Sequence, residues 1–186
     1  MTRRWLTGVL VVVGLTGIDA AVAEGWPGHQ NRATLSVSGA VTAPTTYSAA
    51  QLAALPQTTF TVSRRRWRGS STISETGVSL ETLVNDAQPV LPDAKNALLR
   101  VTVTVAGDWG RRVTLALGEL DPGFGNHPAY LALSRDGRAL RAPELVIPGD
   151  SDGLRTVPDA SAVSVAVQNP ALTTPPAGAV RSRTGR

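Results

Sequence analysis

The chain has 186 residues, 42% hydrophobic and 17% charged, a composition typical of one folded domain and not of a disordered chain. It contains no cysteine, which excludes disulfides, iron–sulfur clusters, thiolate zinc sites and cysteine nucleophiles, and its two histidines are too few for a three-histidine metal site. The formal net charge is +4, but part of the basicity lies at the chain ends, so we expect no nucleic-acid binding. These terminal arginines are Arg3, Arg4, Arg181, Arg183 and Arg186.

The first 23 residues have the pattern of a secretory signal peptide. Arg3 and Arg4 precede an apolar run over residues 5–18, and a small-x-small cleavage site follows at residues 21–23. The run is shorter than the ~20 residues of a membrane span, and Asp19 interrupts it. We therefore expect an exported protein, periplasmic or secreted, with no stable membrane span after cleavage. An uncleaved N-terminal anchor is the alternative, and the export route, general secretory or twin-arginine, stays open.

The mature chain divides into three parts by composition. Residues 24–33 are polar and interrupted by Gly and Pro, which predicts a flexible lead-in. Residues 34–168 carry the apolar periodicity of a folded domain. Residues 169–186 contain Pro, Thr, Ala, Gly and Arg without any periodicity, which predicts a disordered tail.

The first half of the domain alternates between strand and helix patterns. Residues 34–38 alternate apolar and polar side chains, which predicts a half-buried strand. Ser48 is a suitable N-cap for a short helix over residues 49–55. A second alternating stretch at 58–64 predicts a strand, and residues 79–86 place apolar side chains at helical spacing.

Strand patterns dominate the second half. Residues 99–105 show the cleanest alternation in the chain, and we expect further strands at 112–117, 130–133, 145–147 and 162–167. Strands outnumber helices and the helices are short, so the fold class is α+β or mostly β and not a doubly wound parallel sheet.

Two loops carry residues that suit anion binding. Residues 64–69 place four arginines beside Trp67, which fits a phosphate or sulfate clamp, although a solvated hairpin tip is the favoured interpretation. Residues 121–128 combine glycines with His127, which fits backbone contacts to an anion, although a tight turn is favoured there too.

Three other features bear on possible chemistry. Asp108 and Trp109 follow the strand predicted at 99–105. They could serve as a general base and as an aromatic wall that stacks on a ligand, but a turn between strands is the favoured interpretation. Residues 149–153 lack the distal Glu and the acidic spacing of a calcium loop, so no calcium site is expected. A hydrolase would depend on His127 alone, since no serine lies in a GxSxG motif.

Several stretches, taken in order, resemble one protein family. Residues 35–41 with the following Pro44 resemble its opening, and Gly77–Val84 resembles its GVxLxxLL helix. Three later stretches continue the likeness, at residues 117–126, 136–140 and 145–150. The family is the oxidoreductase molybdopterin-binding domain of sulfite-oxidase type, in its small exported single-domain form, and the resemblance covers about residues 34–168.

This resemblance implies a mixed α+β, largely β fold with short helices. In catalytic relatives it implies a molybdopterin cofactor whose molybdenum is ligated by a cysteine thiolate. Here residues 61–63, where that thiolate is expected, offer hydroxyl groups, which are poorer metal ligands. Relatives often have an arginine where Glu144 stands, and Asp-Gly-Tyr where this chain has Trp109-Gly110-Arg111.

Two functions remain open besides the hydrolase. The first is binding of a pterin-type cofactor or another anionic small molecule, with no protein metal ligand and with catalytic residues unknown. The second is a cofactor-free extracytoplasmic binding or accessory module on the same fold, which the missing thiolate and Glu144 favour. The residues proposed to contact the anion are Ser63, Arg64, Arg111, Asn126, His127 and Arg155.

Overall fold

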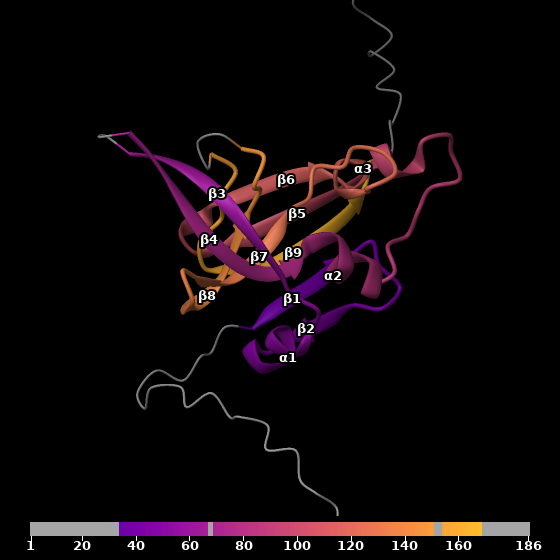
Figure 1. The fold of residues 1–186 in the computed structure, drawn as a ribbon. Coiled ribbons are helices and arrows are strands. Elements are labelled where there is room, and N and C mark those ends of the chain that lie inside the picture. The colour runs from indigo at the N-terminus through magenta and orange to yellow at the C-terminus, as the bar shows by residue number, and fades with distance from the viewer. Residues whose placement is uncertain (1–33, 67–68, 151–153, 169–186) are drawn as a thin grey trace, which may run out of the picture. The chain divides into compact units, whose positions relative to one another are not determined.

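The computed structural model describes residues 34–66, 69–150 and 154–168. This part of the chain forms two β-sheets joined by short helices (Figure 1), which confirms the expectation of a largely β, α+β domain. The predicted signal peptide (1–23), lead-in (24–33) and tail (169–186) lie outside the described residues.

The first sheet has five strands in the order β2-β1-β9-β5-β6. β1 and β9 run parallel, and every other neighbouring pair is antiparallel. The parallel pair brings the two ends of the domain together in the middle of the sheet. The strands span β1 (Leu35–Gly39), β2 (Thr45–Tyr47), β5 (Val101–Gly107), β6 (Arg112–Ala116) and β9 (Ala160–Val167).

The second sheet has four antiparallel strands in the order β3-β4-β7-β8. β3 and β4 form the long hairpin that extends toward the upper left of Figure 1. The described part of the arginine-rich stretch lies in this hairpin, as the favoured interpretation expects, but Arg64 is not a solvated residue, because its side chain is largely buried. The strands span β3 (Thr58–Arg66), β4 (Gly69–Ser79), β7 (Tyr130–Arg135) and β8 (Arg138–Val146).

The two longest helices begin within one residue of their predicted starts. Ser48 caps α1 (Ala49–Ala54) through a capping box, in which its hydroxyl accepts from the Gln51 N–H and the Gln51 side chain accepts from the Ser48 N–H. Ser79 caps α2 (Leu80–Asp86) by accepting a hydrogen bond from the Thr82 N–H. Shorter helical turns are η1 (Ala97–Arg100), η2 (Asp108–Gly110) and α3 (Leu117–Leu120).

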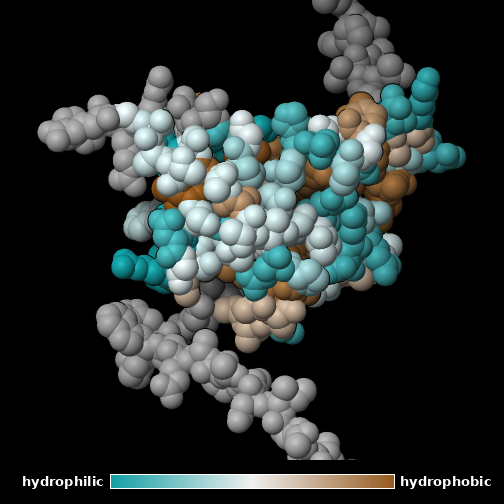
Figure 2. All heavy atoms as spheres, in the orientation of Figure 1, coloured by the Kyte–Doolittle hydropathy of each residue, from teal (hydrophilic) through white to brown (hydrophobic). Residues whose placement is uncertain are grey.

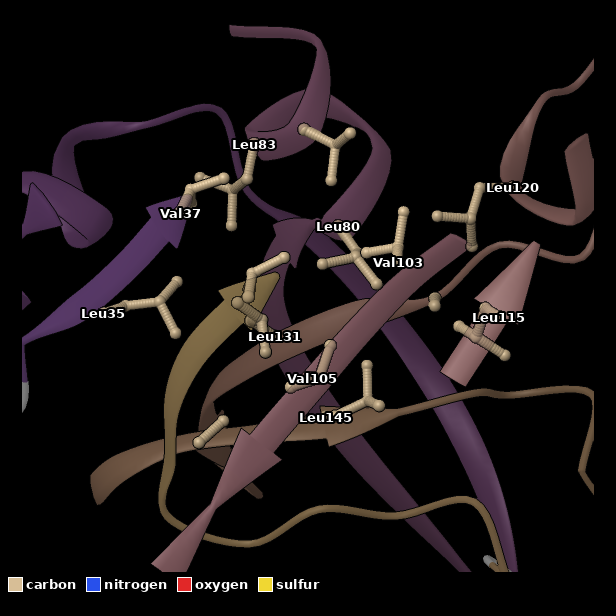
Figure 3. Packing of buried hydrophobic residues seen from close by; sticks show 14 of the residues in the cluster. Leu35, Val37, Leu80, Leu83, Val103, Val105, Leu115, Leu120, Leu131 and Leu145 are labelled. Atoms are coloured by element: carbon tan, nitrogen blue, oxygen red, sulfur yellow. The ribbon is translucent and has the colours of Figure 1, made fainter. Parts of the chain in front are cut away.

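The main core lies between the two sheets and α2 (Figure 3). Val37, Val103 and Val105 reach it from the five-stranded sheet, and Leu131 and Leu145 from the four-stranded sheet. Each of these side chains is at most 1% exposed. Burial of this apolar surface is the main force that holds the two sheets together.

A second, smaller core covers the opposite face of the four-stranded sheet. Val62, Ala132 and Val146 are its buried members, and Phe60 and Leu140 pack against them. The Phe60 ring also stacks on Tyr130, with ring centroids 4.4 Å apart. The four-stranded sheet is thus buried on both faces at its centre, and any charged group placed there must find a partner inside the protein.

Two long strands differ from the sequence prediction. The sequence does not predict β4, and β8 begins at Arg138 where the sequence predicts a strand over 145–147 alone. In both strands a carboxylate occupies a position that faces the smaller core, Glu75 in β4 and Glu144 in β8. Apolar and polar residues therefore do not alternate along these strands, so the sequence pattern does not reveal them, although their backbones pair regularly.

Smaller corrections concern strand ends and one short strand. Leu98 and Leu99 belong to η1 and not to the following strand, because they pack beside Gly118 of α3. Leu117 begins α3 and does not end β6. The three-residue β2 is absent from the sequence prediction, since such a short stretch carries no readable periodicity.

The face of the molecule shown in Figure 2 is mostly hydrophilic or intermediate in hydropathy, with apolar residues visible in scattered patches. Within the described ranges, no helix has the length and apolar character needed to cross a membrane.

Candidate functional site

The six residues predicted to contact an anion do not converge on one place. Ser63 and Arg64 are neighbours in β3, and neighbouring strand residues point to opposite faces of a sheet. Ser63 is exposed, whereas Arg64 lies two residues after Val62 and so shares its face of the strand, the face of the smaller core. A single ligand therefore cannot bind both side chains through the same face of the sheet.

Arg64 is part of a closed ring of four charged side chains, called the charge ring below. Its Nη2 atom lies 3.1 Å from Glu75 Oε1 and 2.9 Å from Glu144 Oε1. Arg135 closes the ring, with Nε 2.7 Å from Glu75 Oε1 and Nη2 2.6 Å from Glu144 Oε2. Each of the four strands of the sheet contributes one member, so the charge ring joins β3, β4, β7 and β8.

The members of the charge ring differ in their exposure to solvent. The Glu75 side chain is 0% exposed, and the Arg64 side chain keeps 25% of its surface in solvent. Burial opposes the charge on Arg135, but hydrogen bonds to Glu75 and Glu144 more than offset it, so the Arg135 pKa lies above its ordinary value. The Arg64 guanidinium is thus committed to two carboxylates of its own chain, and the ring as a whole carries no net charge.

Arg111 is committed as well, but to the backbone. It follows η2, and its Nε donates to the Thr156 carbonyl at 2.5 Å while Nη2 donates to the Leu154 carbonyl at 2.9 Å. The side chain thereby ties the start of β6 to the segment before β9. This role is structural, and it occupies two of the donors with which an arginine would bind a phosphate.

Arg155 stands at the centre of a second group of charges, called the Arg155 cluster, which also contains Glu119, His127 and Asp150. Asp150 accepts two parallel hydrogen bonds from Arg155, at 2.9 Å from Nε and 2.8 Å from Nη2. Arg155 Nη1 also donates to Glu119 Oε2 at 3.3 Å. The two carboxylates outweigh the arginine, so the cluster does not favour an added anion while His127 is neutral.

Electrostatics within the Arg155 cluster agree with this geometry. The hydrogen bond from Arg155 is the main cause that lowers the Asp150 pKa, and it outweighs the opposing effect of burial. His127 is close enough to lower the same pKa further. The hydrogen bond to Asp150 likewise raises the Arg155 pKa. Asp150 and Arg155 therefore stay ionised and paired at neutral pH.

The loop at residues 121–128 brings His127 to this cluster, whereas the backbone N–H of the neighbouring Asn126 donates to Asp121 within the loop. It is a compact turn, because Gly125 N–H donates to the carbonyl of Gly118 at 3.0 Å and the His127 N–H donates to that of Glu119 at 2.8 Å. A Cβ at Gly125 would lie 2.6 Å from the Gly118 carbonyl oxygen, so the loop requires glycine there. His127 Nδ1 lies 3.1 Å from the Gly125 carbonyl oxygen, a contact within the turn. The geometry therefore supports the favoured interpretation as a turn.

The turn at Asp108–Gly110 also matches its favoured interpretation. Trp109 is 95% exposed and has a φ of 64°, a left-handed conformation that is unusual for a bulky side chain. Among the described residues no aromatic ring stacks on it, so it forms no part of an enclosed site.

The residues present do not fit a thiolate-ligated molybdopterin. The full sequence has no cysteine, and no described group of three or more His, Asp or Glu residues is arranged to hold a metal ion. Arg64, Arg111 and Arg155 all donate to acceptors of their own chain. A cofactor phosphate would have to compete with carboxylates for Arg64 and Arg155, and at Arg111 it would find only the donors that the two backbone carbonyls leave unused.

Sequence reasoning missed two members of the charge ring, Glu75 and Arg135. It did single out Glu144, as an isolated acidic group, but the structure pairs Glu144 with Arg64 and Arg135. The available signal was weak: a glutamate within an otherwise polar stretch, with no apolar alternation around it. Only the pairing of β4 with β3 and β7 brings these charges together.

The fold itself is similar to a known one. A crystal structure of the sulfane dehydrogenase SoxCD from Paracoccus pantotrophus matches with a TM-score of 0.57 and 18% sequence identity. The match covers 73% of this chain but 39% of the SoxCD chain, so this chain spans well under half of that protein's length. No family model and no curated protein matches the sequence. At this identity the likeness shows a shared fold, and function has to be argued from the side chains.

Proposed function

We propose that this protein is a cofactor-free binding or accessory module on a sulfite-oxidase-type molybdopterin-binding fold, and that it acts outside the cytoplasm after removal of residues 1–23. The family assignment rests on the ordered sequence resemblance over residues 34–168, and the structural likeness to SoxCD supports the fold. Export is supported by the pattern of the first 23 residues.

One observation carries the cofactor-free part of the proposal. The three arginines expected to hold an anionic cofactor, Arg64, Arg111 and Arg155, all have partners within the chain. In addition, no thiolate exists anywhere in the sequence to ligate a metal. An arginine that a buried carboxylate neutralises is a poor phosphate receptor, because binding would leave that carboxylate unpaired.

Metal and pterin content test this proposal directly. Protein purified from a molybdenum-replete native host should carry well under one molybdenum per chain by elemental analysis and no stoichiometric pterin by fluorescence. Near-stoichiometric molybdenum that survives washing at high salt would overturn the cofactor-free proposal and restore an oxidoreductase. In that case Ser63→Ala and Arg111→Ala identify whether a hydroxyl ligand or a phosphate contact holds the cofactor.

The processing step has its own test. N-terminal sequencing of the exported protein should begin at Glu24, which follows the small-x-small site. Recovery of an intact Met1 in the membrane fraction would instead support an uncleaved anchor.

A second candidate function is binding of a small anion at the Arg155 cluster. It is favoured by one observation, that His127 and Arg155 come from separate parts of the chain and both lie near Asp150. Titration with sulfate or phosphate, followed by the NMR signals of His127, tests it. Saturable shifts that disappear in Arg155→Met support binding, and unchanged signals across the titration exclude it.

A further inference from the structure

The charge ring contains two buried atoms whose hydrogen bonds remain to be accounted for. Glu75 Oε2 and Arg64 Nε are both buried and have no hydrogen-bond partner among the described residues. The two atoms belong to groups that already touch, since Arg64 Nη2 lies 3.1 Å from Glu75 Oε1. One of the atoms accepts and the other donates, so the two requirements complement each other.

Leaving both atoms unsatisfied would be costly. A buried donor or acceptor without a partner loses its hydrogen bonds to water and gains none in return, and the cost is greater for charged groups. Buried polar groups in folded proteins are therefore almost always paired, either with protein atoms or with ordered water. The two atoms lie on a face whose centre is the smaller core, so bulk solvent is not the partner.

The charge and the donor pattern of the charge ring define what can bind there. Two arginines and two glutamates balance, so an added ion would leave a net charge in a buried place. The guest must be neutral, must donate to Glu75 Oε2 and must accept from Arg64 Nε. We infer that the charge ring holds one internal water molecule, which bridges Arg64 Nε and Glu75 Oε2 and completes the network.

This inference is independent of the proposed function, and it has a consequence for motion. Glu75 has no exposed surface, whereas Arg64 and Arg135 are 25% and 31% exposed, so the water can leave only when one of the arginine side chains moves aside. The residence time of the water therefore reports how often one of these two arginine side chains moves aside.

The first test is a crystal structure at a resolution that shows ordered water, for the wild type and for Arg64→Lys. Lysine keeps the positive charge for Glu75 and Glu144 but has no counterpart of Nε. Electron density for one water within hydrogen-bond distance of both atoms is expected in the wild type and not in Arg64→Lys. Arg135→Lys is the matched control, because it alters the other half of the charge ring and leaves both bridged atoms in place.

The second test works in solution. Magnetic relaxation dispersion should detect one long-lived water in the wild type and in Arg135→Lys, and one fewer in Arg64→Lys. Infrared spectroscopy separates the competing explanation, a proton on Glu75. A carboxylic-acid carbonyl band at neutral pH that disappears in Glu75→Gln would overturn the inference, as would a direct protein partner for both atoms in the crystal.

Discussion

Two arginine-centred groups of charges differ in this protein by their burial. The charge ring sits against the smaller core, with Glu75 fully buried, whereas Arg155 in the Arg155 cluster is 38% exposed and Glu119 is 45% exposed. Their hydrogen-bond distances are similar. The distance across an ion pair therefore does not measure its contribution to the free energy of unfolding, because the cost of losing one partner depends on whether water can replace it.

The largest expected effect comes from breaking the charge ring. Arg135→Met leaves Glu75 and Glu144 to share one arginine in a buried place, so we expect the free energy of unfolding to fall by about 3 kcal/mol. Urea denaturation measures the change. Arg141→Met is the matched control, since Arg141 is 73% exposed and its loss should change stability by at most ~0.5 kcal/mol. Equal effects of the two variants would contradict the comparison.

A double substitution tests whether the side chains of the charge ring stabilise the protein as a unit. Glu75→Leu combined with Arg135→Met removes one negative and one positive charge and leaves Arg64 bound to Glu144. We expect the double variant to be more stable than the sum of the two single effects predicts, with a coupling of roughly 1–3 kcal/mol. Strictly additive effects would mean that the four side chains do not act as a unit.

The Arg155 cluster should show its contribution as a pH dependence. Asp150 has a folded-state pKa below its unfolded value because Arg155 donates to it. Its contribution is therefore present above the unfolded value of about 4 and is lost as the pH falls through the folded value. Asp150→Asn should lower stability by about 1 kcal/mol at pH 7, a figure already reduced for the partial exposure of Arg155. The difference between variant and wild type should shrink below pH 4, and a constant difference in thermal unfolding from pH 7 to pH 3 would contradict this.

The smallest expected effect is that of salt. At 1 M NaCl the screening length is ~3 Å, so the coupling between Asp150 and Arg155 should fall by a few tenths of a kcal/mol. The coupling between Glu75 and Arg135 should keep most of its value, because solvent ions do not reach Glu75. Double-mutant cycles at low and high salt measure both couplings, and equal losses at the two places would remove the distinction between them.

Features that depend on local patterns could be predicted from the amino-acid sequence alone. Ser48 caps its helix as predicted, because side-chain caps act within three residues, and the second helix begins at Leu80, one residue after its predicted start. The alternation of apolar and polar residues around Val103 predicted β5, an interior strand of the five-stranded sheet, since a strand with one buried face alternates in this way. The absence of cysteine excludes thiolate chemistry whatever the fold, because no other side chain supplies a thiolate.

The pairing of charged side chains could not be predicted from local patterns, because it depends on how the strands pair. Arg64 reads in the sequence as one of four neighbouring arginines suited to an anion, yet the register of β3 with β4 turns it toward Glu75, and the β7–β8 pairing adds Arg135 and Glu144. Their sequence separations reach 80 residues, and no local pattern reports a contact over that distance. Strand register fixes the meeting, because a shift of one residue would turn each of these side chains to the other face of the sheet.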